Sequence, residues 1–329
     1  MKALLCKEHG LPDALVLEEV DAPPLSAGTV RIEVRAAGVN FPDVLIIQGK
    51  YQFQPPLPFA PGGEVAGVVA EVGEGVTTVA VGDRVLGLTG WNGFAEQAVV
   101  PVEKCFAIPD AMPFDVAAAF GMTYGTVAHA LLQRGQVQPG EVLLVHGATG
   151  GVGTAAIEIG RCLGASIIAT GGRAEKLEVL QREYDLPHVI DISAETPLKE
   201  AVKKLTKGRG ADVIFDPVGG EVFEQSLRCI NWNGRLLVVG FASGTIGVAK
   251  ANLTLLKGSS VVGVFWGAFT TKEPERNAEN FRRLFAWYAE GKLKPRISHR
   301  FPLAEGGRAI EALMKREVLG KAVVIVSED

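Results

Sequence analysis

The 329-residue chain has little cysteine, and its cations do not cluster. Its four cysteines are far apart and form no C-x-x-C pair, which argues against disulfides and against a cysteine zinc cluster. The net charge is −4 and there is no run of lysine or arginine, whereas binding to nucleic-acid phosphates needs clustered cations. We therefore expect no nucleic-acid partner.

Long apolar runs are also missing. Charged residues within the first eight, Met-Lys-Ala-Leu-Leu-Cys-Lys-Glu, stand where a signal peptide needs its apolar segment, and no later window is apolar for long enough to span a bilayer. We expect a cytoplasmic protein that does not associate with membranes. Hydrophobic residues still make up 47% of the chain, which is enough to give two domains sizeable cores.

One stretch organises the chain. An apolar run from Val142 to Val145 stops at small residues, and apolar residues then recur at helical spacing from Val152 to Leu163, which predicts a strand, a tight turn and a helix. Backbone N–H groups in such a turn can approach a dinucleotide pyrophosphate, and Gly153 lets the helix pack against the strand. The alternative is a glycine turn without a ligand. The residues predicted to bind the cofactor here are Ala148, Thr149, Gly150, Gly151, Val152 and Gly153.

The pattern of apolar residues, Gly and Pro differs before and after residue 120. Residues 1–110 carry short apolar segments that alternate at period two, closely punctuated by Gly and Pro, and they predict a compact β-barrel. The following region alternates strands and helices, which predicts an α/β fold with a doubly wound parallel sheet. The predicted elements are strands at 142–145, 166–170, 189–191, 213–216, 236–240, 261–264 and 322–326, and helices at 152–163, 174–184, 278–289 and 304–315.

Three motifs in the first region carry a family resemblance. They are Ala37-Gly38-Val39-Asn40-Phe41-Pro42-Asp43, Pro61-Gly62-Gly63-Glu64-Val65-Ala66-Gly67-Val68-Val69 and Val81-Gly82-Asp83-Arg84-Val85. With them, the chain resembles the zinc-independent quinone oxidoreductase branch of the medium-chain dehydrogenase/reductase superfamily along essentially its whole length. The resemblance implies a GroES-like catalytic domain from residues 1–120 and 267–329, and a Rossmann NADPH-binding domain from residues 121–266. It also accounts for Ala148, which stands where the commonest fingerprint has its first glycine.

The end of the second predicted strand indicates which nucleotide binds. NAD-selective units usually place an acid there, about twenty residues after the glycines, whereas this chain has Gly171 and Gly172 followed by Arg173 and Lys176. The glycines leave room and the cations suit a 2′-phosphate, so NADPH is expected. Alternatively, both cations are ordinary solvated residues at the start of a helix.

The resemblance adds detail to the nucleotide site. It matches Lys176 to a phosphate-binding lysine and Arg316 to a second cation. The family often has a tyrosine where Ile192 stands, which is a departure from its pattern. Glu175 lies inside the predicted helix and is badly placed to hold a ribose.

The chain lacks the zinc ligands of the superfamily's alcohol dehydrogenases. Asn40 and Gly63 stand at the positions of their cysteine and histidine, and neither is a normal zinc ligand. The five histidines form no local ligand pair, so we expect no metal. Without a Lewis acid, the easier chemistry is hydride transfer to an acceptor that is already electrophilic, such as a quinone or an α,β-unsaturated carbonyl.

Three residues are candidates for catalysis. Asn40 can donate its side-chain N–H near the substrate or simply form a turn. By resemblance, Tyr51 lines the substrate entrance, where it donates a proton, stacks on a planar acceptor or only packs. Thr123 matches a hydroxyl that contacts the nicotinamide, with capping as its alternative role. Further cofactor contacts are expected from Gly172 after the second predicted strand, and from Gly240, Phe241 and Phe265 at the ends of late strands.

The predicted activity is NADPH-dependent, zinc-independent reduction of quinones. One alternative is an ene reductase of α,β-unsaturated carbonyls or enoyl thioesters. An alternative of another class is a catalytically idle NADPH-binding sensor or moonlighting protein, because fold and cofactor site do not fix function. A homodimer is expected through an edge strand near Ser259–Val264.

Overall fold

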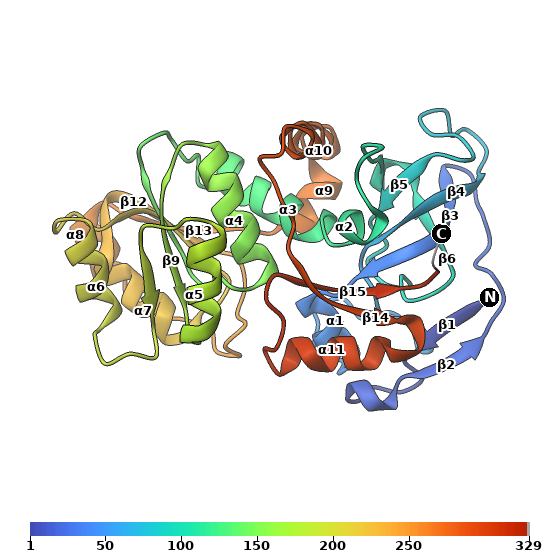
Figure 1. Ribbon diagram of the computed structural model, residues 1–329, viewed down its shortest axis with the longest axis horizontal. Helices are drawn as coiled ribbons and strands as arrows, with labels where there is room; N and C mark the ends of the chain where they lie inside the picture. The colour runs from blue at the N-terminus through green and yellow to red at the C-terminus, as the bar shows by residue number, and fades with distance from the viewer. Residues whose placement is uncertain (328–329) are drawn as a thin grey trace. The chain divides into compact units, whose positions relative to one another are not determined.

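The computed structural model describes residues 1–327, which form two compact units. The first unit contains Met1–Met122 and the chain from Pro295 onward, and the second contains Thr123–Lys294. In Figure 1 the first unit runs from blue to teal and returns in red. Within the described residues, no helix is both long enough and apolar enough to cross a bilayer.

The second unit extends well beyond residue 266, where sequence analysis ended it. The residues that follow form α9 (Trp266–Lys272) and α10 (Pro274–Ala289). Phe269 of α9 is buried and stacks on the His129 ring, with the two ring centroids 4.0 Å apart. This packing joins α9 to the second unit rather than to the barrel.

The first unit is β-rich, as predicted. Its strands are β1 (Lys2–Leu5), β2 (Val16–Glu19), β3 (Thr29–Gly38), β4 (Val65–Val72), β5 (Arg84–Gly87), β6 (Gln97–Pro101), β7 (Cys105–Ala107), β14 (Ile297–Pro302) and β15 (Lys321–Ile325). Seven of them form one sheet in the order β14-β15-β3-β4-β5-β7, with β6 also paired to β3. β1 and β2 form a separate antiparallel pair. The closing strand β15 pairs antiparallel with β3, which confirms that the C-terminal segment returns to this unit.

Alternation along β3 builds the core of the first unit. Val30, Ile32 and Val34 are almost completely buried, whereas Glu33 is exposed, as a strand with period two requires. These valines and isoleucines belong to one apolar cluster with Ile310. The helices of the unit are α1 (Phe41–Ile46), α2 (Phe114–Ala118) and α11 (Gly306–Met314), of which α11 confirms the helix expected at 304–315.

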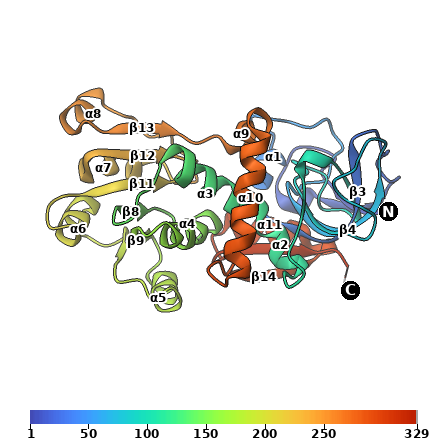
Figure 2. The same ribbon diagram turned by 90° about the horizontal axis from the view of Figure 1, so that it is seen from above.

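The second unit contains the predicted parallel sheet. Its strands are β8 (Val142–Val145), β9 (Ser166–Gly171), β10 (Val189–Asp191), β11 (Ala211–Asp216), β12 (Ile230–Val238) and β13 (Ser260–Gly263). They are all parallel and lie in the order β10-β9-β8-β11-β12-β13, part of which can be followed in Figure 2. Numbered within this unit the order is 3-2-1-4-5-6, which is the dinucleotide-binding arrangement. The predicted α/β fold is therefore confirmed.

Helices flank this sheet on both faces. The helices of the second unit are α3 (Gly121–Ala128), which begins two residues before the unit, a π-helix (His129–Arg134), α4 (Gly151–Cys162), α5 (Ala174–Glu183), α6 (Leu198–Leu205), α7 (Gly220–Cys229), α8 (Ala251–Lys257), α9 and α10. Leu143 of β8 faces Gly160 of α4, whose added Cβ would lie 2.7 Å from the leucine. Its neighbour Leu144 instead joins a core cluster with residues of α6 and α7. Because successive strand residues point to opposite faces, α4 and the α6–α7 pair cover opposite sides.

Candidate active site

The loop after β8 turns sharply at Gly147. This residue has φ = +56°, a left-handed conformation that favours glycine. The N–H of Ala148 donates to the Thr170 carbonyl at 2.9 Å, and the N–H of Gly150 donates to the Gly147 carbonyl at 3.0 Å. These bonds fix the turn between β8 and α4.

The first turn of α4 is built for a close approach. Its N-cap residue is Gly150, which has no side chain to satisfy the first N–H groups, so a phosphate oxygen can take that place. A Cβ added to Gly153 would lie 2.2 Å from the Gly147 carbonyl oxygen and 2.6 Å from the Ala148 Cα. Only glycine permits this spacing, as the sequence predicted.

The predicted 2′-phosphate residues lie where β9 ends. Arg173 is the exposed N-cap of α5, and Lys176 is half-buried in the first turn of that helix. A Cβ on Gly171 would lie 3.6 Å from Thr149 Cγ2, so this end of β9 borders the phosphate loop. A Cβ on Gly172 would lie 3.8 Å from Ile192 Cγ1. The two cations and the loop thus share one edge of the sheet.

The late-strand residues lie at the same carboxyl edge. Phe241 and Phe265 follow β12 and β13 and are 41% and 47% exposed, and Gly240 precedes Phe241. Thr123 is buried near the start of α3. Open parallel sheets bind ligands at this edge, which fits the predicted cofactor contacts.

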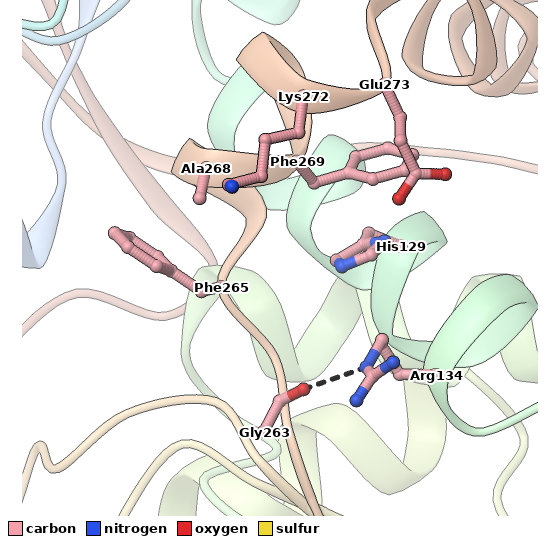
Figure 3. Close-up of a pocket in the computed structure, with 8 residues that line it drawn as sticks. All are labelled: His129, Arg134, Gly263, Phe265, Ala268, Phe269, Lys272 and Glu273. Carbon is pink, nitrogen blue, oxygen red and sulfur yellow. Dashed lines mark hydrogen bonds between the residues drawn. The ribbon is translucent and has the colours of Figure 1, made fainter.

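An open hollow lies beside Phe265 (Figure 3). Arg134 lines it and donates from Nε to the Gly263 carbonyl at 2.9 Å. Burial lowers the pKa of His129, which also lines the hollow and stacks on Phe269. The imidazole is therefore neutral at pH 7 and serves packing.

Asn40 lies in the first unit and is almost completely buried at the N-cap of α1. Its side-chain N–H donates to Glu64 Oε1 at 2.8 Å and weakly to the Gly38 carbonyl at 3.5 Å. Its Oδ1 accepts a hydrogen bond from Lys321 Nζ at 2.6 Å. The sequence left two roles open for Asn40, contact with the substrate or formation of a turn. In the structure its side-chain amide is engaged within the protein, and its backbone forms the turn that begins α1.

Asp43 completes the turn at Asn40. Its Oδ2 accepts from the Asn40 N–H at 2.7 Å, and its Oδ1 accepts from the Gly62 N–H at 2.9 Å. Complete burial raises the pKa of this carboxyl to about 6, against the opposing effects of these hydrogen bonds and of the Lys321 charge. Asp43 therefore titrates well above an ordinary aspartate.

Tyr51 and Arg316 also belong to the first unit. Tyr51 is half-buried against the barrel core, and its ring lies edge-on to Phe53 with centroids 6.3 Å apart. Burial, and then the charge of Asp43, raise the pKa of Tyr51, so its hydroxyl stays protonated at neutral pH. Arg316 is exposed just after α11, at φ = +56°.

Family models match residues in both units. The model "Alcohol dehydrogenase GroES-like domain" matches residues 26–110, and the model "Zinc-binding dehydrogenase" matches residues 151–287. The "Quinone oxidoreductase-like protein 2 homolog" of Nematostella vectensis is 40% identical over 326 residues, which are 98% of this chain and 88% of the relative. The chain belongs to the quinone oxidoreductase-like branch of the medium-chain dehydrogenase/reductase superfamily.

Two further members of this branch match over the full length. "Quinone oxidoreductase" of Sus scrofa is 32% identical, and the alignment covers 99% of this chain and 98% of the relative. The crystal structure of Escherichia coli quinone oxidoreductase complexed with NADPH superimposes with a TM-score of 0.90 at 29% identity, covering 99% of this chain and all of the other. The predicted family is confirmed.

The zinc-ligand positions of the superfamily are filled differently in this member. Asn40 is held by Glu64 and Lys321, and a Cβ on Gly63 would lie 2.9 Å from Met122 Sδ. Among residues 1–327, no group of three His, Cys, Asp or Glu side chains is arranged to hold a metal ion.

Glu64 and Lys321, which hold the Asn40 side chain, are not among the site residues predicted from the sequence. Glu64 stands inside a quoted motif, directly after Gly63, and Lys321 begins β15. The one feature of the sequence that could indicate Glu64 and Lys321 is that each is an ionisable residue next to apolar residues that are expected to be buried. Nothing in the spacing of the two residues linked them.

Proposed function

We propose that the protein is an NADPH-dependent, zinc-independent reductase that transfers hydride to quinones. The observation that carries this proposal is the edge of the second sheet, where an uncapped helix N-terminus lies close to the Arg173 and Lys176 pair. The first group suits a pyrophosphate and the second a 2′-phosphate. The NADPH complex of the Escherichia coli relative supports the same nucleotide.

Each set of residues has a distinct task in this proposal. NADPH, when bound, supplies the hydride, and one proton completes reduction of a quinone to a hydroquinone. The loop from Ala148 to Gly153 holds the pyrophosphate, and the backbone near Phe265 holds the carboxamide. Thr123 contacts the nicotinamide, while the protonated Tyr51 donates a hydrogen bond to the developing oxyanion. Asn40 shapes the acceptor-binding loop rather than donating to the acceptor.

The proposal is tested by following NADPH oxidation with a panel of quinones and enones. We expect turnover of quinones. Turnover of enones alone would instead identify an ene reductase. Tight NADPH binding without turnover of any acceptor would identify an idle binding protein.

The Arg173→Ala/Lys176→Ala variant should bind NADPH more weakly, by on the order of a hundredfold or more, because it removes two charge-assisted bonds to phosphate that contribute roughly 1.5–3 kcal/mol each. NADH lacks this phosphate, so its Kd should change little. Fluorescence titration with both nucleotides measures the two constants. Glu175→Ala, an exposed change in the same helical turn, is the matched control and should leave both constants unchanged. Equal weakening for NADH would contradict the assignment.

We propose that a second copy of the chain pairs with β13. This strand is one edge of the sheet, and apolar side chains on it or next to it are exposed: Trp232 at 65%, Leu255 at 80%, Leu256 at 70% and Val261 at 38%. An unpaired edge beside apolar side chains favours isologous strand pairing. Light scattering should show a dimer that Val261→Lys weakens. Val81→Lys, an exposed change in the other unit, is the control. A monomeric wild type would exclude the dimer.

A further inference from the structure

An internal ion pair lies beneath the Asn40 turn. Glu64 is completely buried and Lys321 is 5% exposed, and Lys321 Nζ lies 3.0 Å from Glu64 Oε1. Burying two charges is costly unless their remaining hydrogen-bonding groups are also satisfied. We therefore ask whether every hydrogen-bonding group of this pair has a partner.

All three N–H groups of the Lys321 ammonium have acceptors. They are the Val39 carbonyl at 2.8 Å, Asn40 Oδ1 at 2.6 Å and Glu64 Oε1 at 3.0 Å. A group so engaged cannot pass a proton to a ligand without breaking this arrangement. Lys321 therefore acts through Asn40 rather than on a substrate.

The Glu64 carboxylate joins two segments of the first unit. Its Oε1 accepts from Asn40 Nδ2 at 2.8 Å and from Lys321, while its Oε2 accepts from the Met122 N–H at 2.7 Å in the first turn of α3. Met122 is followed in the chain by Thr123. One carboxylate therefore fixes the Asn40 turn and the start of the helix that carries Thr123.

Two glycines leave the space that this carboxylate fills. A Cβ on Gly38 would lie 2.1 Å from the Ala118 carbonyl oxygen and 2.4 Å from Glu64 Oε1, and a Cβ on Gly121 would lie 2.9 Å from Leu88 Cδ2 and 3.0 Å from Glu64 Oε2. Neither glycine has a positive φ, so close approach rather than backbone conformation accounts for both. The Glu64 carboxylate is thus one of the groups for which each glycine leaves room.

We propose that Glu64 and Lys321 form one positioning unit, which sets the Asn40 turn and the first turn of α3 relative to each other for hydride transfer. This inference rests on the proposed function. Neither residue is a catalytic residue. Their effect is on the placement of Asn40 and Thr123, where displacements of about 1 Å can cost on the order of a hundredfold in rate.

Glu64→Gln tests the proposal, because the amide must turn an N–H toward either the Met122 N–H or the Lys321–Asn40 donors. We expect kcat with a quinone to fall by about tenfold or more, while the NADPH Kd stays within about threefold because the phosphate-binding residues are untouched. The amide hydrogen of Met122 should exchange faster than in wild type. Glu71→Gln, in the strand β4 that directly follows Glu64, is the matched control, because the Glu71 side chain is 57% exposed where it pairs with Arg31.

The double variant Glu64→Gln/Lys321→Met separates placement from folding. It removes the unpaired buried ammonium, so its Tm should rise above that of Glu64→Gln while kcat stays low. Should Glu64→Gln fail to fold, the double variant is compared with wild type instead. A kcat that recovers with Tm, or a folded Glu64→Gln with wild-type kcat, would overturn the proposal.

The exchange measurement also distinguishes the two proposals. If wild type reduces no acceptor, the proposed function fails, yet Met122 exchange still reports whether Glu64 holds α3. Unchanged exchange in Glu64→Gln would overturn the positioning unit whatever the activity.

Discussion

Gly153→Ala should raise the Kd for NADPH by roughly a hundredfold or more, because losing two or more phosphate bonds costs several kcal/mol. The added methyl group would lie 2.2 Å from the Gly147 carbonyl oxygen and 2.6 Å from the Ala148 Cα. Both are backbone atoms, so α4 or the loop must move and the N–H groups lose their alignment. Isothermal titration with NADPH measures the change, and circular dichroism checks the fold.

Gly150→Ala is the matched control for that change. Gly150 has φ = −87°, and a Cβ there would meet only the Gly147 carbonyl oxygen, at 3.4 Å. The helix start should keep its shape, so NADPH binding should weaken far less than in Gly153→Ala. Wild-type affinity in Gly153→Ala would contradict the assignment of this loop to the pyrophosphate.

Asp43 should make the protein less stable as the pH rises from 4 to 6. The folded state keeps the carboxyl proton up to a pKa of about 6, whereas the unfolded chain releases it near 4. The unfolded state thus binds fewer protons in this window, and its stability relative to the folded state rises with pH. A difference of two pKa units corresponds to a contribution of roughly 3 kcal/mol from Asp43 to the free energy of unfolding. This contribution is present in full below pH 4 and is lost as the pH passes 6.

Comparison with Asp43→Asn isolates this contribution from other titrating groups. The amide cannot ionise, so the stability of wild type minus that of the variant should decrease by roughly 3 kcal/mol between pH 4 and pH 7. Urea unfolding at several pH values measures it. A difference that stays constant across this range would show that Asp43 ionises normally.

The strands of the second unit could be predicted from the sequence one by one, whereas its helices α6, α7 and α8 were not predicted. Its strands are apolar and end at glycines or at charged residues, as in Val142–Val145 and Gly171-Gly172-Arg173, so local composition sets both their type and their limits. The helix expected at 174–184 is α5 (Ala174–Glu183). The placement of Arg173 and Lys176 at its start followed from these same local signals.

The acceptor side of the site could not be predicted to the same depth. The contact between Lys321 and Glu64 spans 257 positions of sequence, and neither residue lies in a pattern that indicates the other. Asn40 was recognised, but whether its amide faces a ligand or the protein depends on that distant partner. The extent of the second unit beyond residue 266 likewise depends on tertiary packing, such as Phe269 on His129.

The buried ammonium of Lys321 also limits how this scaffold can be redesigned. Restoring the superfamily's metal ligands at Asn40 and Gly63 would place a dication beside a fixed positive charge, which now lies 2.6 Å from Asn40 Oδ1. A dication bound at this position and the Lys321 ammonium would repel each other in a buried environment. A designer would have to neutralise Lys321 and then compensate Glu64, so acquiring a metal here requires a change of the whole internal charge balance rather than two substitutions.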